Sequence, residues 1–290
     1  MKTNRCLAHG VNLVRLWLAL SLTQALAVAA FGSETVKLSI ICSKQEWFVG
    51  EPLVLQLDFK NVSETNQFVE TELQNGVGWA GYWISSDGTN YTEIGANVFH
   101  DPVGRKTSIT ANESLYHEEI LWFNSRTGRS LFTNAGDYFL RVDCRGRTSN
   151  ALKIHVKNPT RDIDKNWANV FQTREVLLAG TRGGQKSDAA VKLLQECANT
   201  LSTYSPYAAY FLAQTELEKT NALALYEKAD VADFPLQGRA VYEKARINLE
   251  LGEKAKAKAN ELFQRIANDF PNSAAASEVK RKNLLESSKP

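Results

Sequence analysis

Three short segments of this 290-residue chain match motifs that support chemistry, and the first is a glycine-rich run. Residues 76–81 read Gly-Val-Gly-Trp-Ala-Gly, which matches the Gly-x-Gly-x-x-Gly spacing of a dinucleotide-binding loop. That loop must open a helix, because the helix N-terminus meets the pyrophosphate. Here the glycines lead into residues 82–84, Tyr-Trp-Ile, which alternate as a strand. We therefore interpret the segment as a turn or bulge and expect no cofactor.

The other two motifs involve serine, lysine and histidine. Ser277 and Lys280 match the Ser-x-x-Lys spacing of serine acylases, but the companion motifs are absent and the pair lies in the last polar helix. His117 and the two glutamates after it lie on a predicted strand, where consecutive side chains diverge. His100, His117 and His155 are scattered, so their spacing indicates no metal site. We expect no catalytic residue, no metal and no enzymatic activity; an active site at a domain boundary is the alternative.

Cys42 and Cys144 are placed to meet in one core. Alternating apolar residues put Cys42 on the inward face of a strand over 36–42, and Cys144 on the inward face of a strand over 137–144. A disulfide between them is one prediction, and two buried thiols are the other. Cys197 follows leucines at helical spacing and is expected to be a small core residue.

An aromatic segment over 79–83 is a candidate ligand surface. Trp79 and Trp83 alternate to one face of a predicted strand, and Tyr82 lies on the other face. One set is expected to fill the core. The other set can stack on sugar rings, grip a peptide or pack within the protein. Trp79, Tyr82 and Trp83 therefore form the alternative ligand surface, for carbohydrate.

The first 32 residues are typical of a secretory signal peptide. A basic region ends at Arg15, an apolar core follows over 16–26, and the small residues 27–29 precede the expected cleavage at Ala29-Ala30. The apolar run is short for a bilayer-spanning anchor, which is the alternative. We expect a periplasmic or secreted protein without a stable membrane span after cleavage.

Composition indicates a soluble globular protein of two domains. The chain is 43% hydrophobic and 23% charged, with a net charge of +2. This balance lacks the basic footprint of a nucleic-acid-binding protein, so nucleic acid is not an expected partner.

Period-two alternation dominates residues 33–158 and predicts an antiparallel β-sandwich of about eight short strands. Asp87-Gly88 is a strong hairpin turn signal between two of these strands. The clearest strands are expected at 36–42, 53–60, 115–123, 137–144 and 150–157.

Residues 159–290 predict antiparallel helical hairpins. Tyr210, Ala213 and Leu217 recur 32 residues later as Tyr242, Ala245 and Leu249. Each copy ends at a Phe-Pro pair, at 234–235 and 270–271. The expected helices span 206–218, 221–231, 237–251, 253–268 and 273–286. Repeats of this kind usually form a binding scaffold, and an ordinary helical bundle is the alternative.

Each half of the chain resembles a known family. Residues 135–142, Ala-Gly-Asp-Tyr-Phe-Leu-Arg-Val, resemble the Gly-x-Tyr segment of bacterial immunoglobulin-like domains. That resemblance implies that Tyr138 opens a core strand and that its hydroxyl ties the preceding corner. The antibody-type disulfide pattern is absent, because Cys144 lies six residues after Tyr138 and Cys42 is on the first strand. The order of alanine, glycine, aromatic and proline positions over 242–271 resembles tetratricopeptide repeats, which implies a groove that binds extended segments.

Together these patterns predict an exported, non-catalytic protein-binding or scaffold protein, with a protein or peptide of the cell envelope as its partner. The resemblance to tetratricopeptide repeats implies a contact surface on the first helix of each pair, at Tyr207, Tyr210, Tyr242 and Arg246. A carbohydrate-binding protein that uses the aromatic segment 79–83 is the alternative. The sequence leaves the identity of the partner and the oligomeric state open.

Overall fold

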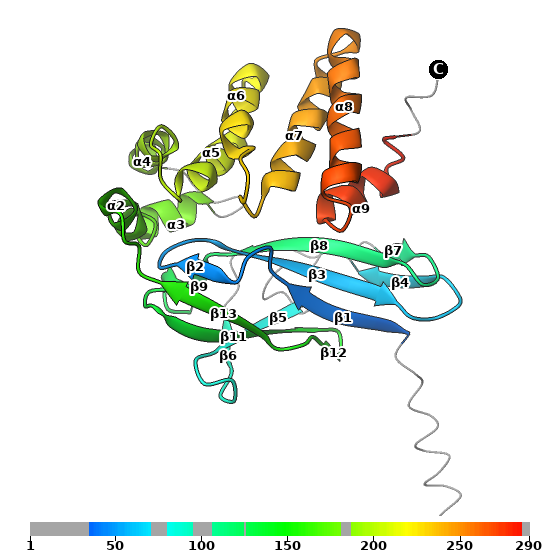
Figure 1. Ribbon diagram of the computed structural model, residues 1–290, viewed down its shortest axis with the longest axis horizontal. Helices are drawn as coiled ribbons and strands as arrows, with labels where there is room; N and C mark the ends of the chain where they lie inside the picture. The colour runs from blue at the N-terminus through cyan, green and yellow to red at the C-terminus, as the bar shows by residue number, and fades with distance from the viewer. Residues whose placement is uncertain (1–34, 71–79, 95–105, 125, 181–186, 286–290) are drawn as a thin grey trace, which may run out of the picture.

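The computed structural model describes residues 35–70, 80–94, 106–124, 126–180 and 187–285. The described residues form antiparallel sheets followed by eight helices, so the chain is of mixed β and α content (Figure 1). The predicted signal segment 1–32 lies outside these residues. In the part of the chain that the structure describes, no helix combines the length and apolarity needed to cross a membrane.

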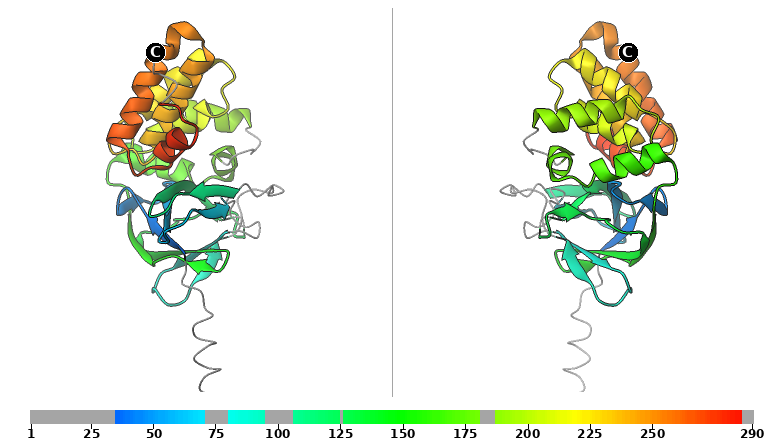
Figure 2. Two further views of the ribbon diagram at one scale, coloured as in Figure 1. Left: turned by 90° about the vertical axis from the view of Figure 1, so that its right-hand side faces the viewer. Right: turned by 90° about the vertical axis from the view of Figure 1, so that its left-hand side faces the viewer.

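Two larger sheets lie one above the other in the strand region (Figures 1 and 2). The first has the order β1-β3-β8, with β1 at Val36–Ile41, β3 at Leu53–Asn61 and β8 at Ser114–Leu121. The second has the order β2-β13-β11-β5-β6, with β2 at Glu46–Phe48, β13 at Leu152–Lys157, β11 at Gly136–Cys144, β5 at Ala80–Ser85 and β6 at Thr92–Ile94. All pairs in these two sheets are antiparallel except β2 with β13.

The remaining strands are short and lie beside these sheets. They are β4 (Gln67–Glu70) paired with β7 (Lys106–Ile109), β9 (Phe123–Asn124) paired with β10 (Arg129–Ser130), and β12 (Arg147–Thr148), which pairs with β11. The sequence pattern predicted all of the longer strands but not β2, β9, β10 or β12, because two or three residues carry no readable period.

Alternation explains why the two sheets pack together. Leu53, Leu55 and Leu57 of β3 and Leu140 and Val142 of β11 are all buried, and each alternates with more exposed neighbours except Val54. Burying such faces stabilises the fold by about 25 cal/mol for each Å² of apolar surface removed from water. At the entry to β11 the Tyr138 hydroxyl donates a hydrogen bond to the Asn134 carbonyl oxygen at 3.0 Å.

The helices follow one another as short hairpins above the strands (Figure 1). They are α2 (Asp162–Val170), α3 (Arg174–Gly180), α4 (Asp188–Ala198), α5 (Ser205–Ala213), α6 (Lys219–Ala229), α7 (Gln237–Glu250), α8 (Glu253–Asp269) and α9 (Ala274–Arg281). Ser187 and Ser273 cap α4 and α9 by accepting hydrogen bonds from Ala190 N–H and Ala276 N–H. Gly252, with φ at 96°, lies between α7 and α8.

The ends of two helices depend on local backbone geometry. At the start of α2, Arg161 has the extended N-cap backbone and Asp162 lies in the first turn. There its carboxylate faces the positive end of the helix dipole. The helix expected to end at residue 218 stops at Ala213, because Gln214 to Glu216 form a turn instead.

The strands share one hydrophobic core with the helices α2 to α7, and a second cluster packs α7, α8 and α9 together. Trp122, which follows β8, stacks on Phe211 of α5 with ring centroids 4.8 Å apart and lies 5.3 Å from the Phe171 ring. Its indole N–H donates to the Gly50 carbonyl oxygen at 3.2 Å. A Cβ at Gly180 would overlap the Trp122 ring, so α3 can approach only with glycine at this position. The two halves of the chain therefore pack as one body.

Candidate functional site

The loop over residues 49–52, between β2 and β3, is hydrogen-bonded to residues at the start of α5. The Tyr204 hydroxyl donates to the Val49 carbonyl oxygen at 2.7 Å, and the Tyr207 hydroxyl donates to Glu51 at 2.9 Å. Glu51 also accepts from Phe48 N–H at 2.8 Å and pairs with Lys44. Burial raises the pKa of the Glu51 carboxyl, against the opposing effect of these partners.

The three tyrosines predicted to contact a partner lie in the interior, which corrects that expectation. Tyr207, Tyr210 and Tyr242 are 1%, 2% and 1% exposed. Tyr210 packs edge-on against the rings of Tyr226 and Phe234. Tyr242 packs edge-on against the Phe263 ring of α8. The repeated tyrosine spacing therefore reflects packing inside the protein and not a partner-binding surface.

Arg246, the fourth predicted contact residue, remains on the surface. Its guanidinium forms ion pairs with Glu243 at 3.3 Å and Glu250 at 3.6 Å, and 53% of its side chain is exposed. Tyr242 donates to Glu278 at 3.1 Å and accepts from Lys282 at 2.8 Å, so its hydroxyl is already occupied.

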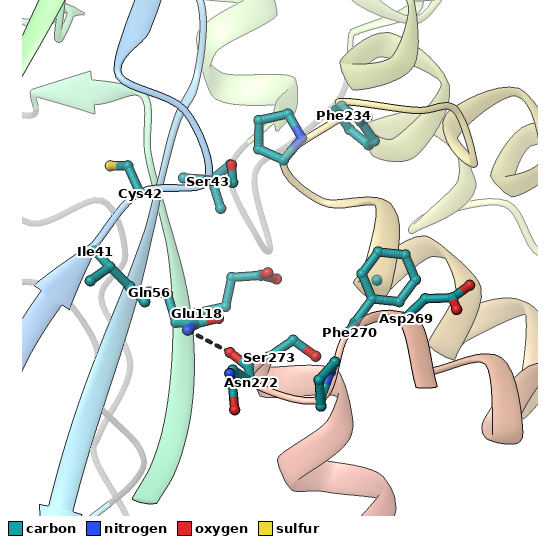
Figure 3. A pocket seen from close by; sticks show the side chains of 14 residues that line it. Ile41, Cys42, Ser43, Gln56, Glu118, Phe234, Asp269, Phe270, Asn272 and Ser273 are labelled. Carbon is teal, nitrogen blue, oxygen red and sulfur yellow. Dashed lines mark hydrogen bonds between the residues drawn. The ribbon is translucent and has the colours of Figure 1, made fainter. Parts of the chain in front are cut away.

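A cavity of about 400 Å³ lies between the β1-β3-β8 sheet and the helices (Figure 3). Ile41, Gln56 and Glu118 line it from the strand side, and Phe234 and Phe270 line it from the helix side. The Gln56 side-chain N–H group donates to the Asn272 carbonyl oxygen at 2.7 Å across its edge. The volume falls within the range of roughly 300–1,000 Å³ that small-ligand sites occupy.

Strand alternation directs the polar residues into this cavity. Leu55 and Leu57 of β3 face the other sheet, so Gln56 between them faces the helices. Glu119 and His117 of β8 pair with Leu55 and Leu57, and Glu118 therefore points to the helix side, as Figure 3 shows. The sequence predicted this alternation, but the wall of the cavity that the helices supply lies more than 100 residues away and was missed.

Glu118 has the most perturbed electrostatics in this cavity. Burial raises the pKa of its carboxyl to about 7, because desolvation outweighs the favourable charge of Arg239. Arg239 is itself held by Glu243 at 3.1 Å and lies 3.9 Å from Glu278. Its guanidinium also lies 5.1 Å from the Tyr242 ring centroid.

Cys42 lines the same cavity, and the predicted disulfide with Cys144 is not formed. Cys42, Cys144 and Cys197 are all thiols. The inward alternation of β1 ends with Ile40, and Cys42 lies beyond the strand, on the side of the helices. Cys144 instead faces the core between the sheets. Burial raises the pKa of the Cys42 thiol to about 12, so it is protonated at neutral pH and is a poor nucleophile.

The aromatic segment over 79–83 divides between core and surface. Trp79 lies outside the described residues. Tyr82 is fully buried, so it cannot contact a sugar. Trp83 faces the outside of the second sheet, where the Arg141 guanidinium lies 5.9 Å from its ring and 4.8 Å from the Tyr91 ring.

The Ser-x-x-Lys pair joins the last helix to the strands. Ser277 accepts a hydrogen bond from Tyr116 N–H at 3.1 Å, and the Lys280 ammonium pairs with Glu113 at 2.6 Å. Both residues thus hold α9 against β8. Among the described residues no three His, Cys, Asp or Glu side chains gather as metal ligands.

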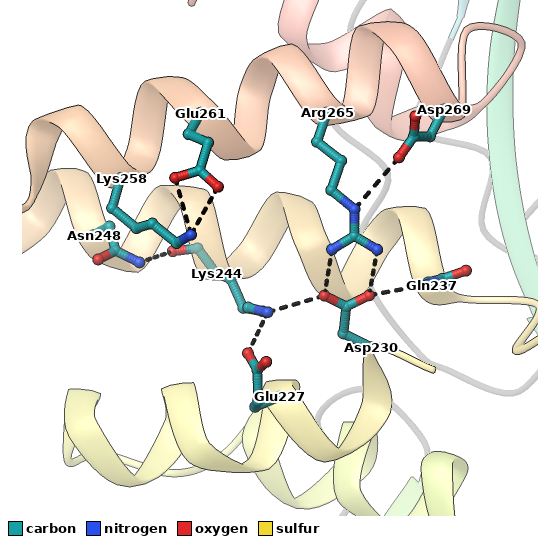
Figure 4. Close-up of polar contacts among 9 residues, drawn as sticks. All are labelled: Glu227, Asp230, Gln237, Lys244, Asn248, Lys258, Glu261, Arg265 and Asp269. Atoms are coloured by element: carbon teal, nitrogen blue, oxygen red, sulfur yellow. Dashed lines mark hydrogen bonds and ion pairs between the residues drawn. The ribbon is translucent and has the colours of Figure 1, made fainter. Parts of the chain in front are cut away.

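A polar network fixes the helices above the cavity (Figure 4). Asp230, which caps the end of α6, accepts from Arg265 of α8 at 2.6 and 2.8 Å and from Lys244 of α7 at 2.9 Å. Burial alone would raise the pKa of Asp230, but these hydrogen bonds lower it to about 2. Sequence spacing gave no signal for this network, because Asp230 and Arg265 lie 35 residues apart.

Comparison with known proteins adds only distant structural likenesses. No family model and no curated protein matches the chain. A β-glucosidase from Listeria innocua in complex with glucose is similar at 13% identity with a TM-score of 0.28, over 45% of this chain and 17% of that one. Spo0M, a sporulation control protein from Bacillus subtilis, is similar at 14% identity with a TM-score of 0.28, over 51% of this chain and 55% of that one. The chain thus spans about a sixth of the glucosidase and about half of Spo0M, and likenesses this weak carry no argument about function.

Proposed function

We propose that this chain is an exported, non-catalytic binding protein that holds a segment of a partner protein in the cavity between strands and helices. The cavity is the observation that carries this proposal. Its walls come from distant positions, such as Gln56 and Asn272, which are 216 residues apart and hydrogen-bonded, so the site exists only when both halves are packed together. Its volume of about 400 Å³ suits one or two side chains of an inserted segment.

The proposal includes an immunoglobulin-like assignment for the strands. The separate sheets β1-β3-β8 and β2-β13-β11-β5-β6 support it, because immunoglobulin-like sandwiches divide their strands in this way. The hydrogen bond from the Tyr138 hydroxyl to the Asn134 carbonyl oxygen supports it as well, since it matches the tyrosine corner of that class.

It also includes a tetratricopeptide-like assignment for the helices. The consecutive hairpins α5–α6 and α7–α8 support this, together with fully buried Ala245 and Ala259 where α7 and α8 approach each other. Scaffolds of this class commonly bind extended segments. In this chain the tyrosines of the first helices are buried, so the cavity takes the place of an open groove.

Two chemical observations favour binding over catalysis. Cys42, which lines the cavity, has a thiol whose pKa is raised to about 12, and Ser277 accepts a backbone hydrogen bond from β8. The signal-like segment 1–32 supports export, and with it a partner in the cell envelope.

The test is capture of a partner from envelope extract by the intact chain and by two tryptophan variants. Ser43→Trp places a large ring at an exposed position on the rim of the cavity. Leu217→Trp is the matched control, because Leu217 is 96% exposed and precedes Lys219, which pairs with Glu250 at the far end of α7. We expect Ser43→Trp to lose the captured protein and Leu217→Trp to keep it. Equal capture by both variants would refute a binding site in the cavity.

The intact chain is required for this experiment. Separate fragments of the strand and helix regions would expose Trp122, Phe171 and Phe211 to water, because these rings form the shared core.

A further inference from the structure

The charge of the cavity lining is of one sign. Fourteen described residues line it, and the only ones that carry a charge at neutral pH are Glu118 and Asp269. Lysine, arginine and histidine are absent from this set of described lining residues. Asp269 lies at the rim, where Arg265 approaches it at 3.5 Å, so the cavity interior depends on Glu118 for its charge.

The Glu118 carboxyl is directed into this space (Figure 3). None of the hydrogen bonds or ion pairs recorded among the described residues involves it, and its pKa is raised to about 7 by desolvation. The Glu118 side chain is partly exposed, so water and the charge of Arg239 still stabilise the ionised carboxylate, but desolvation makes that form less favourable than in open water. A cation that approached the carboxylate inside the cavity would offset this cost.

The groups around Glu118 leave room for such a cation. Among neighbouring charges, Arg239 of α7 most strongly favours the ionised form of Glu118. Its guanidinium is already paired with Glu243 and lies near Glu278. His117, on the far face of β8, also favours the ionised form of Glu118. The other titratable neighbours carry no positive charge. They are Tyr210 of α5, Cys42 after β1, Asp269 at the end of α8, and Glu119 on the far face of β8.

The walls suit the stem that would carry the cation. Phe234, Pro235, Phe270 and Pro271 form the helix side of the cavity, and Ile41 and Val54 contribute from the strands. The methylene stem of a lysine or arginine side chain packs against apolar surface while its charged end reaches a polar partner. Aromatic rings also attract a nearby cation through their π faces.

We propose that the cavity accepts a basic side chain, lysine or arginine, of the bound partner segment, with Glu118 as its counter-ion. This inference rests on the proposed binding function and specifies the chemistry of the partner. Gln56 and Asn272, which are hydrogen-bonded to each other, line the edge of the cavity along which the peptide backbone that carries the basic residue would pass.

The pairing has a defined pH dependence. Glu118 must be ionised to pair with a cation, and burial raises its pKa to about 7. Affinity for a basic segment is therefore expected to rise as pH increases from 6 to 8. Binding of an uncharged segment of the same shape is expected to change little over this range.

The test uses two pentapeptides and the ¹⁵N-labelled intact chain. The first peptide is acetyl-Ala-Ala-Lys-Ala-Ala-amide, and the second replaces lysine by norleucine, which keeps the stem and removes the ammonium group. Each is titrated while the backbone amide signals of Ile41, Gln56 and Asn272 are followed by NMR. We expect the lysine peptide to bind about 10- to 100-fold more tightly, the factor expected for a hydrogen bond to a charged group.

A variant pair extends the test. Glu118→Gln is expected to reduce the affinity for the lysine peptide to that of the norleucine peptide and to remove the pH dependence. Glu113→Gln is the matched control, because Glu113 precedes the same strand but pairs with Lys280 outside the cavity. The peptide comparison does not depend on how either variant folds.

The outcomes separate this inference from the proposed function. Equal binding of both peptides at the cavity amides would overturn the basic-residue inference and leave peptide binding in place. Absence of shifts at these amides with either peptide at millimolar concentration would overturn both.

Discussion

The buried carboxyl of Glu118 should make the protein less stable as pH rises, and Glu118→Gln should remove this effect. In the unfolded chain the carboxyl has its ordinary pKa near 4.5, whereas in the folded protein the pKa is about 7. Between these values the folded state binds more protons than the unfolded state, so the free energy of unfolding falls as pH increases. Below pH 4.5 and well above pH 7 the contribution is constant.

The size of this effect follows from the two pKa values. One pKa unit corresponds to about 1.4 kcal/mol, so the shift from 4.5 to about 7 sets an upper limit of roughly 3 kcal/mol. Because the Glu118 side chain is partly exposed to solvent, screening reduces this contribution to stability to about 1–2 kcal/mol. Relative to the native chain, Glu118→Gln should gain about that much stability between pH 4.5 and pH 8.

The assay is urea unfolding of both proteins at pH 4.5, 6 and 8, with Glu113→Gln as control. The hydrogen bond from Lys280 lowers the pKa of Glu113, so its replacement should give no gain at high pH. A stability difference between Glu118→Gln and the native chain that stays constant from pH 4.5 to 8 would refute the reasoning. A difference that favours the native chain at pH 8 would refute it as well.

Three further predictions concern the packing that forms the cavity. Trp122→Ala should lower the free energy of unfolding by about 3–5 kcal/mol. Urea unfolding should remain a single transition, because strands and helices share the core that contains Trp122. Two separate transitions in the native chain would contradict this. Tyr207→Phe should lower the free energy of unfolding by about 1.5–3 kcal/mol in the same assay, because Glu51 loses a hydrogen bond in a buried site. An unchanged unfolding midpoint would show that this hydrogen bond contributes nothing to stability. Asp230→Asn should lower the free energy of unfolding at pH 7 by up to about 2 kcal/mol, because the pKa of Asp230 is about 2 in the folded protein and 3.8 in the unfolded chain. The loss should shrink as pH falls from 4 towards 2. An equal loss at pH 7 and pH 3 would show that it does not come from the ionised carboxylate.

Local patterns in the sequence predicted most elements. The alternation of β3 and the turns around α7 and α8 placed these elements within a few residues of their observed bounds, because strand and helix periods depend on neighbours close in sequence. The sequence did not predict which face of each helix would be buried against the rest of the protein. Tyr207 was expected at a surface, and it lies against Glu51, 156 residues away.

The candidate site could not be predicted for the same reason. Glu118 appeared only as part of a histidine-glutamate segment on a strand, and nothing near it in sequence indicates that Phe234 and Phe270 close over it. Period-two alternation specifies that its side chain faces away from His117 and Glu119. It does not specify that the helices pack on that face, which depends on the long-range contacts of Trp122 and residues 49–52.

Site-specific photo-cross-linking in the producing cell tests whether a partner segment occupies the cavity. A benzophenone side chain is placed at Ser43 on the cavity rim and, in a second protein, at Leu217 at the far end of the helices. We expect a specific cross-linked partner from Ser43, lost in the Glu118→Gln background, and none of the same mass from Leu217. Cross-linking of that partner from Leu217 but not from Ser43 would show that the cavity is not the binding site.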